Sequence, residues 1–299
     1  MKNKVKHIDF RDQISRNKRN SILLLLFVFL ILIFLGYLIG KIIKADFFIF
    51  MTIFSLFSIF YIWLTYYFSA QISLWSVNAK EASREKYKYL YNMVEGLTLA
   101  SGLPMPKVYI MEQQAINAFA TGRNPKNAVV CVTTGALEKL NKDELEGVIA
   151  HELSHIKNYD IRFVTIVAVV VGLIEILAQM FIRSLFYSSH YRNRNERGNI
   201  IFFIIGIILA ILAPIIVKLV QLAISRRREY MADAGAVEIT RYPDGLANAL
   251  KKIKNDSKPL NVNKAVAPMF ISDPAKQRII NLFQTHPPID ERIRILESM

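Results

Sequence analysis

The sequence predicts a mainly α-helical membrane protein with four transmembrane helices and a small β-sheet. Two observations lead to this class. Four long apolar runs interrupt the chain, and the segments between them have the mixed polarity of water-soluble protein. Apolar residues make up 53% of the 299 residues, more than the roughly 45–50% usual in globular domains. Because the excess lies in the four runs, the composition disfavours a wholly soluble protein.

The chain begins with a basic tail, residues 1–20, that carries seven of its lysines and arginines. Positive charge directly before an apolar run is the usual mark of the cytoplasmic side of a membrane. The net charge of +14 is accompanied by no motif of a nucleic-acid-binding module. We therefore expect the charge to direct insertion into a lipid bilayer, and we expect no nucleic-acid partner.

Residues 21–68 are predicted to form a transmembrane hairpin with spans at 21–43 and 46–68. Each run has 23 residues, and a helix rising ~1.5 Å per residue over that length covers the ~30 Å hydrocarbon core. The first run is too long for the apolar core of a cleaved signal peptide. Aromatic residues at the end of the second run, Trp63, Tyr66 and Tyr67, are typical of a membrane interface.

Residues 69–160 have the polarity of a soluble domain. An amphipathic helix is expected over 80–100. Short strands are expected at 108–111, 117–121 and 128–133, with the last two joined as a β-hairpin by the turn formers of 122–127. The single cysteine, Cys131, is interpreted as a buried strand residue.

The next helix has a readable start, because Asn141 can cap it and Glu144 can complete a capping box. It carries the pattern H-E-x-x-H as His151, Glu152 and His155. Two histidines four residues apart share a helix face, so both rings can bind one metal ion at ~2.1 Å. Zinc lowers the pKa of a bound water to about 7, and a neighbouring carboxylate can take its proton as the water attacks a peptide carbonyl. The alternative is a pair of surface histidines that bind no metal.

Residues 161–224 are predicted to form a second transmembrane hairpin with spans at 161–182 and 199–224. Two crossings return the chain to the side it left, so residues after 224 can reach the H-E-x-x-H helix. Glu175 and Gln179 lie inside the third run and are either functional or directed at a neighbouring helix or a wet cavity.

Two acidic residues after the fourth run, Glu229 and Asp233, are four residues apart on an expected helix. A catalytic zinc ion needs a third protein ligand, and Glu229 can supply it. Asp233 can orient one histidine through its distal ring nitrogen. The alternative is an ordinary surface pair beside basic residues.

Four segments resemble the HtpX family of membrane-bound zinc metallopeptidases: 117–122 (NAFATG), 151–155 (HELSH), 228–233 (REYMAD) and 285–288 (THPP). The resemblance implies a gluzincin-like zinc metallopeptidase domain, built from 69–160 and completed by 225–299, with one Zn2+ per chain. It implies His151, His155 and Glu229 as zinc ligands and Glu152 as general base. It also implies quality control of misfolded membrane proteins at the bacterial cytoplasmic membrane.

Other site residues are expected with lesser roles. Asn117, Ala118, Phe119 and Ala120 could hold an extended substrate along a strand edge, and Asn117 could also donate a hydrogen bond to a substrate carbonyl. His286 is either a donor to the oxyanion of the reaction or a histidine at a helix boundary. Asn158 and Asp160 are possible partners of the metal ligands.

The distribution of lysine and arginine places the active site on the cytoplasmic side of a multi-pass inner-membrane protein. Basic residues gather in the tail, at 80–88 and at 226–228, although four arginines in 183–198 leave open that the third and fourth runs do not both span. The alternatives to a quality-control protease are an enzyme like the CAAX prenyl proteases and a non-enzymatic membrane scaffold or chaperone of the same fold.

Overall fold

The structure, a computed structural model, describes residues 10–43, 46–171, 206, 226–256, 258, 269–271 and 287–299. It is mostly helical with one mixed sheet of four strands, as the sequence predicts. The elements in chain order are α1 (Phe10–Ile43), α2 (Phe47–Ser76), β1 (Lys80–Glu81), α3 (Lys88–Ser101), β2 (Lys107–Met111), β3 (Ala118–Gly122), η1 (Pro125–Asn127), β4 (Ala128–Thr133), α4 (Thr134–Lys139), α5 (Lys142–Lys157), α8 (Arg226–Thr240), α9 (Pro243–Asn255) and α10 (Ile289–Glu297).

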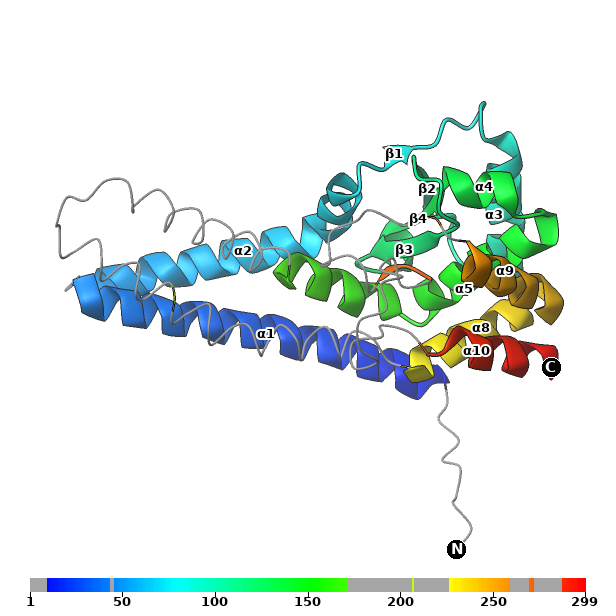
Figure 1. Cartoon of the computed structure of the whole chain (residues 1–299). Coiled ribbons are helices and arrows are strands. Elements are labelled where there is room, and N and C mark those ends of the chain that lie inside the picture. The colour runs from blue at the N-terminus through cyan, green and yellow to red at the C-terminus, as the bar shows by residue number, and fades with distance from the viewer. Residues whose placement is uncertain are drawn as a thin grey trace, which may run out of the picture.

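The first two helices form a hairpin that extends away from the other labelled elements (Figure 1). Among the described residues, two stretches are long and apolar enough to cross a membrane, Ile14–Phe34 and Phe47–Ser76. They correspond to the first predicted hairpin. Of the third and fourth predicted runs only 161–171 and 206 belong to the described part of the chain, where they are helical. Glu175 and Gln179 lie outside it.

Both hairpin helices are longer than the apolar runs that predicted them. α1 starts at Phe10, so half of the expected basic tail is helical, and α2 continues past residue 68 to Ser76. The additional turns bury small and polar side chains such as Asn17, Ser69 and Ser73. These turns therefore pack against the other elements of the molecule and join them to the hairpin.

The sheet has the strand order β1-β2-β4-β3. β3 pairs antiparallel with β4, and η1 joins them, which confirms the predicted β-hairpin. β2 runs parallel to β4, and β1 covers the other edge of β2 in antiparallel pairing. Cys131 lies in β4 with 1% of its surface exposed, as expected for a buried strand residue.

The prediction of a helix over 80–100 was wrong for its first third, because α3 begins only at Lys88. Lys80 and Glu81 instead pair with Ile110 and Tyr109 of β2. Both residues of β1 are exposed, so side-chain periodicity gave no signal for the strand. The conformation of this segment is determined by its main-chain pairing with the open edge of β2. This pairing exists only in the tertiary structure.

Helix α5 lies between the sheet and the helices α8 and α9 (Figure 1). It begins with the predicted capping box, in which the Glu144 N–H donates to Asn141 Oδ1 at 2.9 Å and the Asn141 N–H donates to Glu144 Oε2 at 2.8 Å. Its apolar residues Val148, Ile149 and Leu153 are all less than 2% exposed. The H-E-x-x-H residues are therefore carried on a helix that is fixed on several sides.

Candidate metal centre

Helix α5 carries His151, Glu152 and His155 into the interior of the molecule. His151 and Glu152 are 0% and 1% exposed, and the His155 side chain is 16% exposed. Because the two histidines are one turn apart, their rings meet on one face of the helix, with the two Nε2 atoms 3.2 Å apart. Burying three titratable side chains together is costly unless partners or a metal ion compensate.

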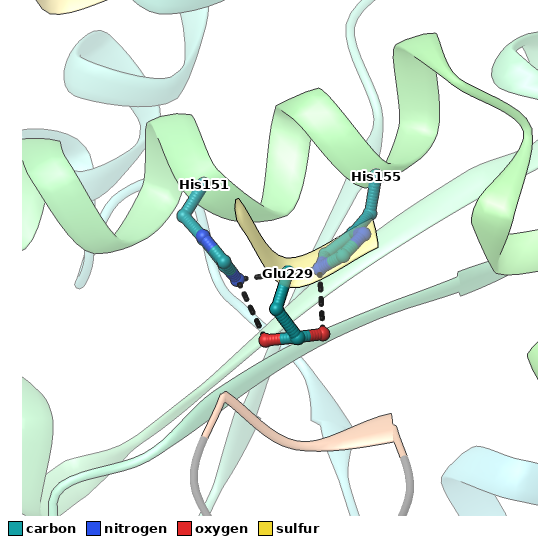
Figure 2. Close-up of side chains that lie close together, drawn as sticks. All are labelled: His151, His155 and Glu229. Carbon is teal, nitrogen blue, oxygen red and sulfur yellow. Dashed lines mark hydrogen bonds and ion pairs between the residues drawn. The ribbon is translucent and has the colours of Figure 1, made fainter. Parts of the chain in front are cut away.

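Glu229 reaches the two histidines from α8 (Figure 2). Its carboxylate oxygens lie 3.8 Å from His151 Nε2 and 3.5 Å from His155 Nε2. Donor atoms around a tetrahedral zinc ion with bonds of ~2.1 Å are ~3.4 Å apart. The three side chains, each with one donor atom within 4.8 Å of the others, therefore have the spacing and the chemistry of a zinc ligand set.

Each histidine also has a carboxylate partner on its other ring nitrogen. His151 Nδ1 lies 2.9 Å from Asp233 Oδ1, and His155 Nδ1 lies 3.0 Å from Asp160 Oδ2. A carboxylate on Nδ1 fixes the tautomer that leaves Nε2 as the acceptor, and it makes that nitrogen a better metal ligand. Both rings are thus oriented for metal binding by residues outside α5.

Arg292, from α10, is the largest fully buried side chain near the centre, with 1% exposure. Its Nε and Nη2 atoms donate to the two oxygens of Asp233 at 2.8 and 2.6 Å, and Nη1 donates to the Ile271 carbonyl at 3.1 Å. Nη1 also lies 3.4 Å from Glu229 Oε2. One guanidinium therefore holds both the partner of His151 and the carboxylate that faces the two histidines.

The surroundings shift the pKa values of the two histidines in opposite directions. Burial lowers the pKa of His151, and the nearby Arg292 charge adds to this effect, so the ring stays neutral. Burial also lowers the pKa of His155, but the hydrogen bond to Asp160 and the charge of Glu229 outweigh it and raise the pKa to about 9. The carboxylates around His155 thus favour a positive charge at this position, as a metal-binding site requires.

Glu152 faces the interior between α5 and β3. Burial raises the pKa of this carboxyl to about 7, although the charge of His155 and a hydrogen bond from the Ala120 backbone oppose the shift. A buried carboxyl with a pKa near the operating pH is suited to general acid–base chemistry. Ala120 also places β3 directly beside this carboxylate.

The segment expected to bind substrate, 117–120, lies along this side of the centre. Asn117 is 2% exposed, and its Oδ1 accepts a hydrogen bond from the Ala118 N–H at 3.0 Å. Phe119 forms a β-bridge with Phe270, and the Ile271 N–H donates to the Ala118 carbonyl at 3.1 Å. The chain's own residues 269–271 therefore occupy part of the β3 edge.

The remaining predicted site residues have different positions. Asn158 ends α5 as its C-cap, and its side chain lies 3.5 Å from Ser154 Oγ rather than on a metal ligand. His286 lies outside the described residues. The structure thus brings together His151, Glu152, His155 and Glu229 with Asp160 and Asp233, and β3 lies alongside them.

Arg292 was not predicted as part of the centre. Its position six residues after His286 was the only available signal, and a lone arginine near a chain terminus is usually a surface residue. Its complete burial against two carboxylates comes from packing between α8 and α10, which sequence spacing does not reveal.

Comparisons with known proteins agree with this geometry. The family model described as "Peptidase family M48" matches residues 84–299. A "Protease HtpX homolog" of Dictyoglomus turgidum is 46% identical over 297 residues, covering 99% of this chain and 96% of that protein. Proteins of the same description are 50% identical over 249 residues in Thermoanaerobacter pseudethanolicus, covering 82% and 83%, and 42% identical over 301 residues in Listeria monocytogenes, covering 96% and 99%.

A crystal structure of S. mikatae Ste24p has a TM-score of 0.49 and 21% sequence identity, covering 95% of this chain and 66% of that one. The family model spans most of the chain and the HtpX relatives span nearly all of it. The chain therefore belongs to peptidase family M48 and, within it, to the HtpX proteases, as the sequence motifs indicated.

Proposed function

We propose that this metalloprotease hydrolyses peptide bonds with one zinc ion held by His151, His155 and Glu229, and with Glu152 as the general base. The observation that carries the proposal is the convergence of two Nε2 atoms and one carboxylate at separations of 3.2 to 3.8 Å. A nitrogen and oxygen donor set of this kind, two histidines and one glutamate, is one that zinc prefers in hydrolases. Three protein ligands also leave a coordination position for water and substrate.

The chain's own residues then perform the proton transfers. A bound zinc ion supplies a Lewis acid that acidifies water and polarises a carbonyl. Glu152 takes a proton from the attacking water and can return it to the leaving amine. Its pKa of about 7 suits both directions of transfer near neutral pH. Asp160 and Asp233 keep the two imidazoles in the metal-binding tautomer while Glu152 works beside them.

The test compares cleavage of an unfolded model protein by the purified full chain with zinc and by its Glu152→Gln variant. The variant keeps the size of the side chain but cannot accept the proton, so we expect it to bind zinc normally and to lose cleavage by about 10²- to 10⁴-fold. Equal cleavage by both proteins would overturn the mechanism. Zinc binding without cleavage by the unaltered chain would instead favour the scaffold or chaperone alternative.

A second variant, Glu229→Ala, addresses the third ligand. If Glu229 binds the metal, its removal should weaken zinc affinity and abolish cleavage together. Unchanged affinity would remove Glu229 from the ligand set. Glu146→Ala is a matched control, because that glutamate is 31% exposed on α5 and, within the described part of the chain, its ion pair is a long one with Lys142 at 3.8 Å.

Substrate binding at the β3 edge is part of the same proposal. An extended peptide that adds to a strand edge is held mainly through its main chain, so many sequences can bind. The position of β3 beside Glu152 supports this. Because residues 269–271 already bridge Ala118 and Phe119, a substrate strand must pair further along the edge or take the place of this bridge.

We also propose that the substrates include membrane proteins and that the site faces the cytoplasm of a bacterial inner membrane. The hairpin supports this location, because α1 begins and α2 ends beside the soluble elements (Figure 1). Cationic side chains stack on aromatic rings of the C-terminal half of α2. Arg123 lies 4.4 Å from the Tyr67 ring, and Arg162 lies 5.2 Å from the Tyr66 ring. Basic and aromatic residues at one end of a hairpin are typical of the cytoplasmic interface.

A further inference from the structure

The C-terminal end of α5 and the turn after it, residues 158–160, are held by the first membrane helix. Asn17 of α1 donates one side-chain N–H to the Asn158 carbonyl at 2.9 Å and the other to Asp160 Oδ1 at 2.6 Å. The next residue, Lys18, has its ammonium group 4.2 Å from the centre of the Tyr159 ring. Two consecutive residues of α1 therefore contact all three residues of the turn.

Asn17 is only 3% exposed in a segment that is otherwise basic and polar. A buried amide must satisfy both of its N–H donors, and here both acceptors belong to the turn, 141 and 143 residues away in the sequence. Only the NH₂ group of the amide can serve two acceptors, so the geometry fixes its orientation. The contact with the turn therefore accounts for both side-chain hydrogen bonds of the buried Asn17.

The contact leads directly to a metal ligand. Asp160 is 2% exposed, and its two oxygens have separate partners: Oδ1 accepts from Asn17 and Oδ2 lies 3.0 Å from His155 Nδ1. With both oxygens engaged, the carboxylate plane cannot rotate. The plane in turn sets the rotation of the His155 ring and the direction of Nε2 towards Glu229.

The backbone of the turn also needs support. Tyr159 has a φ of 58°, a left-handed conformation that is uncommon and unfavourable for a bulky residue. This conformation lies in the short turn at 158–159, between α5 and the helical residues from 160 onward, directly before Asp160 reaches His155. The hydrogen bond from Asn17 to Asn158 and the stacking of Lys18 hold the chain in this conformation.

We propose that Asn17 is a positioning residue of the metal centre, which orients Asp160, and through it His155, from the first membrane helix. The proposal rests on the proposed function, because it assumes that His155 binds the metal. It implies that the order of the metal site depends on the docking of α1, and hence on the membrane hairpin. The soluble elements alone would then have a weaker site.

The test measures zinc affinity by competition with a chelator, using the full chain in detergent. Asn17→Ala should weaken zinc binding roughly tenfold, the lower part of the range for residues that support metal ligands. Cobalt(II) in the same site should show an altered visible absorption spectrum, because the His155 ring is less well oriented. Ser21→Ala is the matched control: Ser21 is also buried on α1 but, among the described residues, its hydroxyl donates to the Asn17 carbonyl of its own helix at 2.8 Å and not to the turn.

A double-mutant cycle with Asp160→Ala separates positioning from packing. If Asn17 acts through Asp160, Asn17→Ala should cause no further loss of zinc affinity once Asp160 has been removed. Additive losses, or an unchanged affinity and cobalt spectrum in Asn17→Ala, would overturn the proposal. Should Asn17→Ala fail to fold, Asn17→Leu fills a similar volume without a donor or a new charge and should weaken binding in the same way. Failure of the unaltered chain to bind zinc would instead refute the proposed function.

Discussion

His155 lies between two carboxylates, with Asp160 at Nδ1 and Glu229 at Nε2. Although burial lowers the pKa of the ring, these negative neighbours raise it to about 9. A metal ion needs the neutral ring, so zinc binding at pH 7 must release a proton. Below the raised pKa of His155, a proton competes with the zinc ion for the ring nitrogen. We therefore expect the apparent zinc affinity to increase about tenfold per pH unit from pH 7 towards about pH 9 and then to level off.

Calorimetric zinc titrations in buffers of different ionisation enthalpy measure this proton directly. The expected result at pH 7 is the release of at least one proton per zinc ion. In Asp160→Asn the raising influence is lost, so the pH at which affinity levels off should fall. An affinity that is independent of pH between 6 and 9 would contradict His155 as a ligand with these neighbours.

Arg292 neutralises two buried carboxylates, Asp233 and Glu229. Removing one partner of a buried ion pair leaves an uncompensated charge, which costs about 3–5 kcal/mol. We therefore expect Arg292→Met to lower the free energy of unfolding by this amount, measured with chelator present so that no metal replaces the lost cation. Arg294→Met, on the exposed face of the same helix, should leave the unfolding transition unchanged, and equal effects of the two changes would contradict the role of Arg292.

The sequence predicted the residues of the centre where their relation is local or carries a known spacing. His151 and His155 are one turn apart, and Glu229 and Asp233 share a second helix. Arg292 and Asn17 could not be predicted in this way. Their contacts join segments 59 and 143 residues apart, and in the sequence they are ordinary polar residues of a helix.

Helix α5 packs closely against α9 at Gly147, where a Cβ atom would lie 2.6 Å from the Leu246 backbone nitrogen. Alanine gains up to about 1 kcal/mol of helix propensity over glycine, but forcing a methyl group against backbone typically costs 1–3 kcal/mol. We expect the steric cost to prevail, so Gly147→Ala should lower the thermal unfolding midpoint. Gly96 of α3 is the control, because a Cβ there meets nothing within 4 Å, and Gly96→Ala should raise the midpoint.

Some element boundaries could be predicted from local sequence patterns, whereas others depend on tertiary packing. The capping box of α5 and the turn-rich link between β3 and β4 are local signals, and both elements formed where expected. The strand β1 was missed because two exposed residues have no periodicity. The helices α1 and α2 extend beyond their apolar runs because the soluble elements bury their final turns, and no hydropathy pattern reports such packing.

At the scale of the whole molecule, the proposed location in a bacterial inner membrane means that the hairpin holds the catalytic elements at one face of the bilayer. If this face is cytoplasmic, the link at Asp46 must lie on the opposite side from Lys126, which precedes β4. Both residues are exposed, so cysteines at these positions can react with a thiol reagent that does not cross membranes. In intact cells from which the outer membrane has been removed, Asp46→Cys should be labelled. Lys126→Cys should be labelled only after the inner membrane has been permeabilised.

The native Cys131 does not interfere with this experiment. It is 1% exposed, and burial raises the pKa of its thiol, so it carries little of the reactive thiolate. The unaltered chain should therefore remain unlabelled in both conditions. Labelling of Lys126→Cys in intact cells together with protection of Asp46→Cys would reverse the proposed orientation.

The measurement that tests the zinc centre most directly is X-ray diffraction at the zinc absorption edge from crystals of the full chain grown with zinc. We predict one strong anomalous peak, ~2.1 Å from His151 Nε2, His155 Nε2 and a carboxylate oxygen of Glu229. The Glu152 carboxylate should lie beside the peak without binding it. A peak at any other position, or one from which Glu229 is absent, would contradict the account.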